Sequence, residues 1–237
     1  MERPGAEIDA RAANPRAPEA VPHVVAIVDR ALPFTTMTCD TSAATVRFGD
    51  VVAHVRAGAD PLAPWRDALR AQMQSRHAVP VPPHVPAAFV LQWWCEVAAT
   101  PMAYAASLGP WLLVPAASGL GFELAPGLYP DRITVDPDGT SLEVDDDPAG
   151  RLERARTAYV ALVSEVVTAY APGVKMSSRQ RWGVVEDMWE TAVRRARGAA
   201  GESVGPEPAR VSCCFIYALP GMLECAACPR HGRPGSG

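Results

Sequence analysis

Four of the six cysteines in this chain fall within residues 213–228, and they constrain the fold of that segment more than any other feature. They are spaced as C-C-x10-C-x2-C, with a Pro-Gly dipeptide between the two pairs. Pro-Gly suits the middle of a type II turn, because proline presets its own φ and glycine accepts a positive φ. Such a turn would bring Cys213 and Cys214 back against Cys225 and Cys228, which predicts a metal site.

Four thiolates suit either a tetrahedral zinc ion or an iron-sulfur cluster, and the spacing bears on the choice. Structural zinc ligands usually come as two pairs, each spaced by two to four residues, because one ion needs both thiolates of a pair on the same side of a tight turn. Adjacent cysteines in an extended chain point to opposite faces, which fits the two metal positions of a 2Fe-2S cluster better. A zinc knuckle and a disulfide-linked tail stay open as alternatives, although a cytosolic chain rarely keeps disulfides.

The segment resembles the C-terminal signature of the FhuF-type ferric siderophore reductases, which has an arginine, a Cys-Cys pair, an aromatic stretch, Pro-Gly and a closing C-x-x-C-P. The counterparts in this sequence are Arg210, Cys213, Cys214, Tyr217, Pro220, Gly221, Cys225, Cys228 and Pro229. The resemblance implies that the four cysteines hold a 2Fe-2S cluster as cofactor and metal ligands. It also implies one-electron reduction of siderophore-bound iron(III) to release iron(II), with electron transfer through the cluster and no separate catalytic residue.

The same resemblance implies a hydroxamate-like ferric siderophore as substrate, and a ferredoxin or a reductase as electron donor. Hard oxygen donors hold iron(III) tightly and iron(II) weakly, so one electron would release the metal. Two other functions stay open. One is a non-enzymatic zinc or iron-sulfur module that stabilises the tail or senses redox state. The other is a siderophore-binding protein without reductase activity, because Val184 and Ala218 stand where the family pattern has an asparagine and a basic residue.

Composition supports a folded protein and argues against several classes of function. The 237 residues are 49% hydrophobic, which is enough for a sizeable core. The formal net charge of -4 provides no basic field for nucleic acid. Residues 97–122 carry no charge, but prolines and glycines interrupt them, so we expect no transmembrane span and a cytoplasmic protein. The absence of a Gly-x-Gly-x-x-Gly motif leaves a Rossmann-type cofactor site unsupported.

Turn-forming residues divide the chain into four parts. Residues 1–22 mix Ala, Pro, Glu and Arg without an apolar run, which predicts a disordered arm and no secretory signal. Residues 23–197 are expected to form a helical, siderophore-binding body with a small sheet. Residues 198–209 are a Gly/Ala/Pro linker, and residues 210–233 are the iron-sulfur module. The predicted fold class is therefore α+β, mostly helical, with a small antiparallel β-sheet and a C-terminal cysteine-rich module.

Caps and hydrophobic periodicity predict the elements of the body. Helices are expected at residues 23–32, 61–76, 87–99, 101–108, 148–170 and 178–197. Thr100-Pro101 repeats the cap-and-proline signal of Asp60-Pro61, so we expect a break between the third and fourth helices. A β-hairpin is expected where two alternating runs flank Asp-Pro-Asp-Gly at residues 136–139.

The last two helices of the body have clear start signals. Asp147-Pro148 caps the first of them, at the end of an acidic run that is spaced too closely for a calcium loop. Ser177 and Gln180 match a capping box that opens the second. We expect these two helices to form an antiparallel pair.

Several other residues have structural explanations. The side chains expected in the core are Cys39, Cys95, Trp182 and Trp189, with an aromatic wall for a flat chelate as the alternative for the tryptophans. Arg179 and Arg181 are expected to be solvated, with contact to an acidic donor or an oxygen-rich ligand as the alternative. Of the five histidines, only His231 lies near the cysteines, and a Rieske-type cluster needs two.

Overall fold

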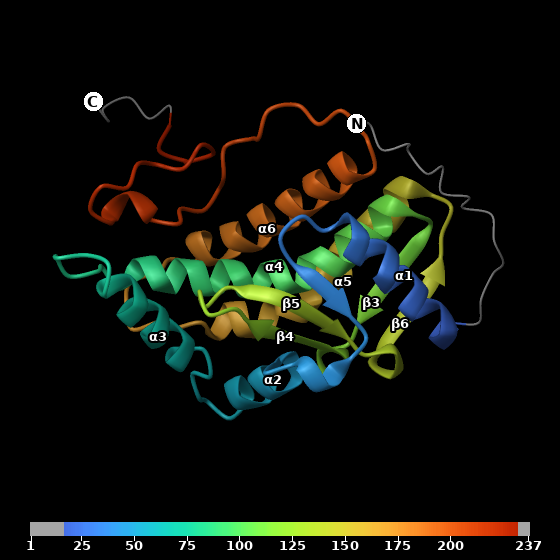
Figure 1. The fold of residues 1–237 in the computed structure, drawn as a ribbon, viewed down its shortest axis with the longest axis horizontal. Helices are drawn as coiled ribbons and strands as arrows, with labels where there is room; N and C mark the ends of the chain where they lie inside the picture. The colour runs from blue at the N-terminus through green and yellow to red at the C-terminus, as the bar shows by residue number, and fades with distance from the viewer. Residues whose placement is uncertain (1–16, 232–237) are drawn as a thin grey trace, which may run out of the picture.

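The structure is a computed structural model that describes residues 17–231. Its body surrounds one long helix, α4, and the cysteine segment lies against one end of that body (Figure 1). The helices are α1 (Ala17–Ala31), α2 (Phe48–Arg56), α3 (Ala63–Gln74), α4 (His84–Leu108), α5 (Pro148–Ala169) and α6 (Ser178–Ala199). The strands are β1 (Thr36–Thr38), β2 (Val46–Arg47), β3 (Trp111–Pro115), β4 (Leu120–Leu124), β5 (Pro130–Val135) and β6 (Thr140–Val144). The structure is 54% helical with small sheets, which confirms the predicted α+β class.

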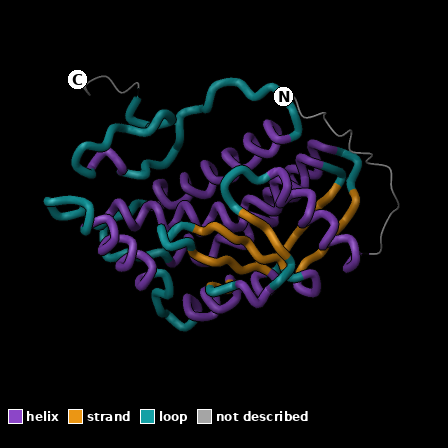
Figure 2. Tube along the Cα trace, in the orientation of Figure 1, coloured by secondary structure: helices purple, strands orange, loops and turns teal. Residues whose placement is uncertain are grey.

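The strands form two small sheets that lie among the helices (Figure 2). The four-stranded sheet has the order β1-β5-β4-β2, and the two-stranded sheet pairs β3 with β6. Only the β1–β5 pair is parallel among these neighbours. The sheets are therefore largely antiparallel, as expected from the short alternating runs.

The predicted hairpin around residues 136–139 is wrong. Strand β5 pairs with β4 and β6 pairs with β3, so residues 111–124 and 130–144 form one long bent hairpin whose tip lies at residues 125–129. Residues 136–139 form the bend, where Gly139 O accepts a hydrogen bond from Ala116 N at 2.9 Å. The Asp-Pro-Asp-Gly turn thus moves the chain from one sheet to the other instead of reversing it.

Helix α4 is continuous, so the predicted break at Thr100-Pro101 is also wrong. An interior proline loses a backbone hydrogen bond and costs about 3 kcal/mol, which favours a break when the helix is considered alone. However, α4 is buried on nearly all sides, and Trp94 near its middle stacks on Phe48 with ring centroids 3.6 Å apart. Thr100 Oγ1 donates to Glu96 O at 2.8 Å instead of capping a new helix. Tertiary packing of α4 therefore outweighs the local signal.

Two helix starts differ from the predictions. Helix α1 begins at Ala17, so the predicted arm of residues 1–22 extends too far toward the C-terminus. The physical reason is that Val21 and Val24 are buried in the core and fix this part of the chain. Residues 1–16 of the predicted arm lie outside the described residues. Asp60 does not cap α3, which starts at Ala63, because its carboxylate forms an ion pair with Arg66 instead.

The caps of α5 and α6 are confirmed. Asp147 accepts a hydrogen bond from Ala149 N at 3.1 Å, and Ser177 Oγ accepts one from Gln180 N at 3.1 Å. Tyr159 of α5 and Trp189 of α6 stack with centroids 5.4 Å apart, which confirms that Trp189 belongs to the core. None of the helices described between residues 17 and 231 has the length and apolar character needed to cross a membrane.

Candidate metal centre

One face of α6 holds the backbone that leads into the first cysteine pair. The buried carboxylate of Asp187 accepts hydrogen bonds from Val211 N at 2.8 Å, from Ser212 N at 2.7 Å and from the Ser212 hydroxyl. About two turns nearer the start of the helix, Gln180 Oε1 accepts a hydrogen bond from Cys213 N at 3.1 Å, and Gln180 Nε2 donates one to Cys213 O at 2.7 Å. Two side chains of α6 thus satisfy the backbone of three successive residues, 211–213.

A glycine between these two side chains lets the segment approach the helix closely. A Cβ at Gly183 would lie 3.0 Å from Val211 Cγ1 and 3.2 Å from Ser212 N, which is tighter than normal packing. The neighbouring Val184 is fully buried. Its side chain therefore faces the interior of the protein rather than a surface ligand.

A second contact fastens the segment to the start of α4. Leu219 is buried against Val81 and Val85 in a small apolar cluster that is separate from the main core. Phe215 packs edge to face on His84, with ring centroids 4.8 Å apart. Figure 1 shows the result, in which the orange-red C-terminal chain runs back along α6 to lie beside the beginnings of α4 and α6.

Two of the four cysteines meet across the Pro-Gly turn. Cys214 Sγ lies 3.9 Å from Cys225 Sγ. All four thiols are free. Cys214 and Cys228 are buried, whereas Cys213 and Cys225 are half-buried. Each sequence pair therefore has one shielded thiol and one near the surface.

The electrostatics of the thiols show what such a site requires. Burial, followed by the neighbouring Cys214 thiol, raises the pKa of Cys225 to about 12, while the positive charge of Arg210 acts in the opposite direction. Burial is also the main cause of the raised pKa of Cys213. Thiolates packed this closely repel one another, so they need cationic metal to be stable together.

The donor set bears on which of the two candidate metal groups the segment can hold. Within residues 17–231, no set of three or more His, Cys, Asp or Glu side chains lies close enough to hold one metal ion. Tetrahedral zinc would need all four sulfurs of the segment about one centre. Four free thiols, with Cys214 and Cys225 in contact across the Pro-Gly turn, match the donor requirement of a group with two metal ions, each of which takes two thiolates. The residues therefore fit a 2Fe-2S cluster.

Backbone and charged side-chain contacts hold the loop around Cys225 and Cys228. Arg210 N donates to Ala227 O at 2.9 Å, which joins the two ends of the segment. The Arg230 guanidinium lies over the Tyr217 ring, 4.2 Å from its centroid, and forms an ion pair of 2.8 Å with Glu224. His231 Nε2 lies 3.2 Å from the other oxygen of Glu224, so the partner of His231 Nε2 in this loop is a carboxylate. A Rieske-type cluster would need two histidine ligands.

The structure also places the other candidate residues of the sequence. Cys95 is fully buried, as predicted, and Cys39 is half-buried. Trp182 is half-buried and packs against the core cluster. Arg181 is not simply solvated, because Nη1 donates to Tyr170 O at 2.7 Å and so satisfies a carbonyl at the end of α5, while Arg179 is exposed.

Sequence reasoning missed the contacts that hold the module. Gln180 was interpreted as part of a capping box, but its side chain binds Cys213 instead of returning to the backbone of Ser177. Asp187 was not singled out at all. A signal was available, because a glycine inside a helix usually has a packing reason, and here Gly183 lies between a glutamine and an aspartate on the same face.

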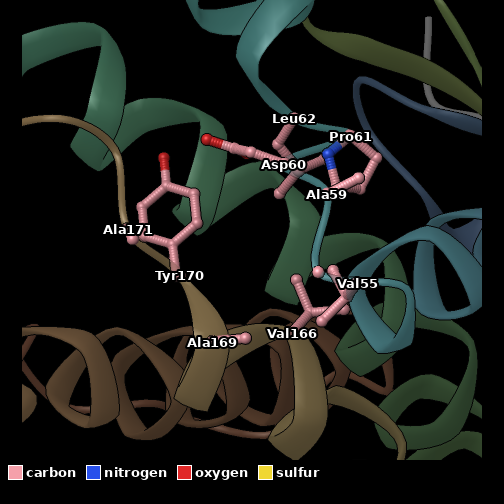
Figure 3. A pocket seen from close by; sticks show the side chains of 10 residues that line it. Val55, Ala59, Asp60, Pro61, Leu62, Val166, Ala169, Tyr170 and Ala171 are labelled. Carbon is pink, nitrogen blue, oxygen red and sulfur yellow. The ribbon is translucent and has the colours of Figure 1, made fainter.

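Two cavities of the body are small and are lined by residues other than the four cysteines of the segment. One of about 120 Å³ lies between the connection from α2 to α3 and the end of α5, and Figure 3 shows Asp60 and Tyr170 among its lining side chains. Another, of about 20 Å³, lies beside Phe34 and Arg195. Pockets for small-molecule ligands usually measure about 300–1,000 Å³, so neither cavity has room for a ferric chelate.

These features describe a helical body with a docked cysteine module, and comparison with known proteins identifies the module. The family model of the FhuF 2Fe-2S C-terminal domain matches residues 210–230. This confirms the resemblance noted from the sequence for that segment, and it supports a 2Fe-2S cluster as the cofactor. No curated protein matches the chain.

Proposed function

We propose that this protein is a ferric siderophore reductase, in which Cys213, Cys214, Cys225 and Cys228 hold a 2Fe-2S cluster and one electron passes from it to chelated iron(III). The observation that carries the proposal is a set of four free thiols, with Cys214 and Cys225 in contact across the Pro-Gly turn, within a segment matched by the FhuF 2Fe-2S domain. When bound, the cluster supplies single electrons at a potential set by charge, hydrogen bonds and exposure. The domain limits are part of the proposal: the siderophore-binding body predicted at residues 23–197, which α1 extends back to Ala17, a linker at 198–209 and the module at 210–233.

Some residues around the thiols would fix the segment that holds the cluster, and the thiols themselves differ in exposure. Gln180 and Asp187 fix the backbone before the first cysteine pair, and Leu219 anchors the turn between the pairs. The two buried thiols keep water from one side of the site. The half-buried Cys213 and Cys225 lie nearer the surface, where an electron would reach a bound partner over a short distance.

The chemistry needs no acid, base or covalent nucleophile from the protein. A hydroxamate-like siderophore binds iron(III) through hard oxygen donors, which bind iron(II) weakly, so one electron is sufficient to free the metal. We place the siderophore on the open surface beside the module. Met222 and Leu223 are exposed there, between the cysteine pairs, and offer an apolar contact.

The electron donor and the compartment follow from the same proposal. A ferredoxin or a reductase would supply one electron for each iron released. The cytoplasm is the proposed location, because its reducing conditions keep free thiols from forming disulfides. All six cysteines in the described part of the chain are free.

The test is turnover of a ferric hydroxamate by the reduced protein, purified and assayed without oxygen. The wild type is expected to be reoxidised by the chelate, with iron(II) trapped in equal amount by a ferrous-specific dye. Cys225→Ser and Cys228→Ser should abolish this reaction, whereas Cys39→Ser, a thiol outside the module, should not. Equal turnover by the module variants and the wild type would remove these cysteines from the function. Tight chelate binding without reoxidation would instead indicate a siderophore-binding protein.

A further inference from the structure

Arg210 has a buried donor that no group among residues 17–231 satisfies. Its Nε has neither a hydrogen-bond partner nor exposure to solvent, and the whole side chain is only 22% exposed. The carboxylate of Glu207, which is 44% exposed, lies 3.7 Å from Nη2 and does not satisfy Nε. Burying a charged donor without an acceptor costs free energy, so such an atom usually has a hydrogen-bond acceptor in the functional protein.

The position of Arg210 limits what that partner can be. Its backbone N donates to Ala227 O, so the residue lies beside the loop from Cys225 to Cys228. Of the groups that would occupy this site, sulfur carrying negative charge is the natural acceptor for a guanidinium N–H.

We propose that Arg210 is a positioning residue of the cluster site, whose Nε–H donates a hydrogen bond to sulfur in the loaded protein and whose charge makes the cluster easier to reduce. This inference rests on the proposed 2Fe-2S site. One-electron reduction adds a negative charge to the cluster and moves no proton, so a nearby positive charge stabilises the reduced form. Arg210 would thereby set how readily the cluster takes an electron from its donor.

The experiment is a redox titration of the anaerobically loaded protein, followed by electron paramagnetic resonance, with dithionite and mediators as the electron source. Arg210→Gln is expected to lower the reduced-to-oxidised ratio at a given potential about tenfold, which is a shift of about 59 mV to more negative potential for one electron. Arg210→Lys keeps the charge but loses the Nε–H, so its shift should be in the same direction and smaller.

The matched control is Arg197→Gln, which removes the same charge from α6 roughly 25 Å farther along the helix than Gln180. Its potential should equal that of the wild type. The inference is overturned if Arg210→Gln shifts the potential no more than this control. If Arg210→Gln fails to load the cluster, Arg210→Lys decides, and a wild-type potential in that variant overturns the hydrogen bond. A wild type that holds no iron and sulfide would instead refute the proposed function itself.

Discussion

At the scale of single residues, the cysteine module depends on polar side chains that the body contributes. Asp187 is the main one, because its buried carboxylate serves three donors of Val211 and Ser212. Hydrogen bonds to a charged group are roughly twice as strong as those between neutral groups. The loss of this carboxylate would leave two backbone N–H groups without an acceptor.

Asp187→Ala is therefore expected to lower the free energy of unfolding by about 2–3 kcal/mol. It should also increase hydrogen exchange at the amides of Val211 and Ser212. The measurements are chemical denaturation and hydrogen exchange read by mass spectrometry. Glu190→Ala is the control, since it removes an exposed carboxylate from the same helix and should change stability by less than about 0.5 kcal/mol. Equal stability of the two variants would contradict the role of Asp187.

The buried thiol of Cys95 allows a prediction about pH and reactivity. Burial raises its pKa from the ordinary value of 9.0 to about 12, so it stays a neutral thiol throughout the physiological range. Its neutral form contributes stability that is complete below about pH 9 and is lost as the pH rises toward about 12. Iodoacetamide at pH 8 should leave Cys95 unmodified in the native protein and alkylate it after unfolding, as mapped by mass spectrometry. Rapid alkylation in the native state would contradict its burial.

At the scale of elements, α6 has two tasks. One face packs Trp189 into the core, and another carries Gln180, Gly183 and Asp187, which bind the chain before the cysteines. The close approach at Gly183 is possible because it has no side chain. The spacing of these three residues keeps them on one side of the helix.

Gly183→Ala separates these tasks. Alanine favours a helix over glycine by up to about 1 kcal/mol, so the body should keep or slightly gain thermal stability. The added Cβ would crowd Val211, so exchange of the amides at residues 211–213 should rise and cluster release to a chelator should become faster. Gly198→Ala is the control, because its Cβ would meet only Val204 Cγ2, at an ordinary 3.8 Å. If both variants release the cluster at the same rate, the contact at Gly183 has no role.

Local signals predicted where helices begin better than they predicted which other elements each helix or strand packs against. The caps at Asp147 and Ser177 were identified because they depend on neighbouring residues alone. The break at Pro101 and the hairpin at residues 136–139 were wrong, because burial of α4 and pairing with distant strands decide those places. Spacing and resemblance predict the four cysteines as the ligand set, which stays a proposal. The side chains that hold this segment come from α6 and cannot be linked to it by sequence distance.

At the scale of the whole molecule, the body and the module are stabilised separately. The main hydrophobic core contains no residue of the cysteine segment, and the segment has only a short 3-10 turn, Ile216–Ala218, as regular structure. Its small apolar cluster with Val81 and Val85 touches the body at one end. The module is therefore expected to depend on its metal more than the body does.

Removal of the cluster by acid and chelator should accordingly leave the helical circular dichroism nearly unchanged. Hydrogen exchange should rise at residues 210–230 and stay low in α4 and α5. Reconstitution with iron and sulfide should restore protection of the module. Global loss of helix on metal removal would show that the module is required for folding of the body, contrary to this account.

The most direct test of the central claim is metal and sulfide analysis of protein purified without oxygen, with absorption and electron paramagnetic resonance spectra of the same sample. About two irons and two sulfides per chain, with a paramagnetic signal that appears on one-electron reduction, are the expected result. Stoichiometric zinc without sulfide, persisting when iron and sulfide are supplied for reconstitution, would contradict the account and leave a structural zinc knuckle in place of an electron-transfer site.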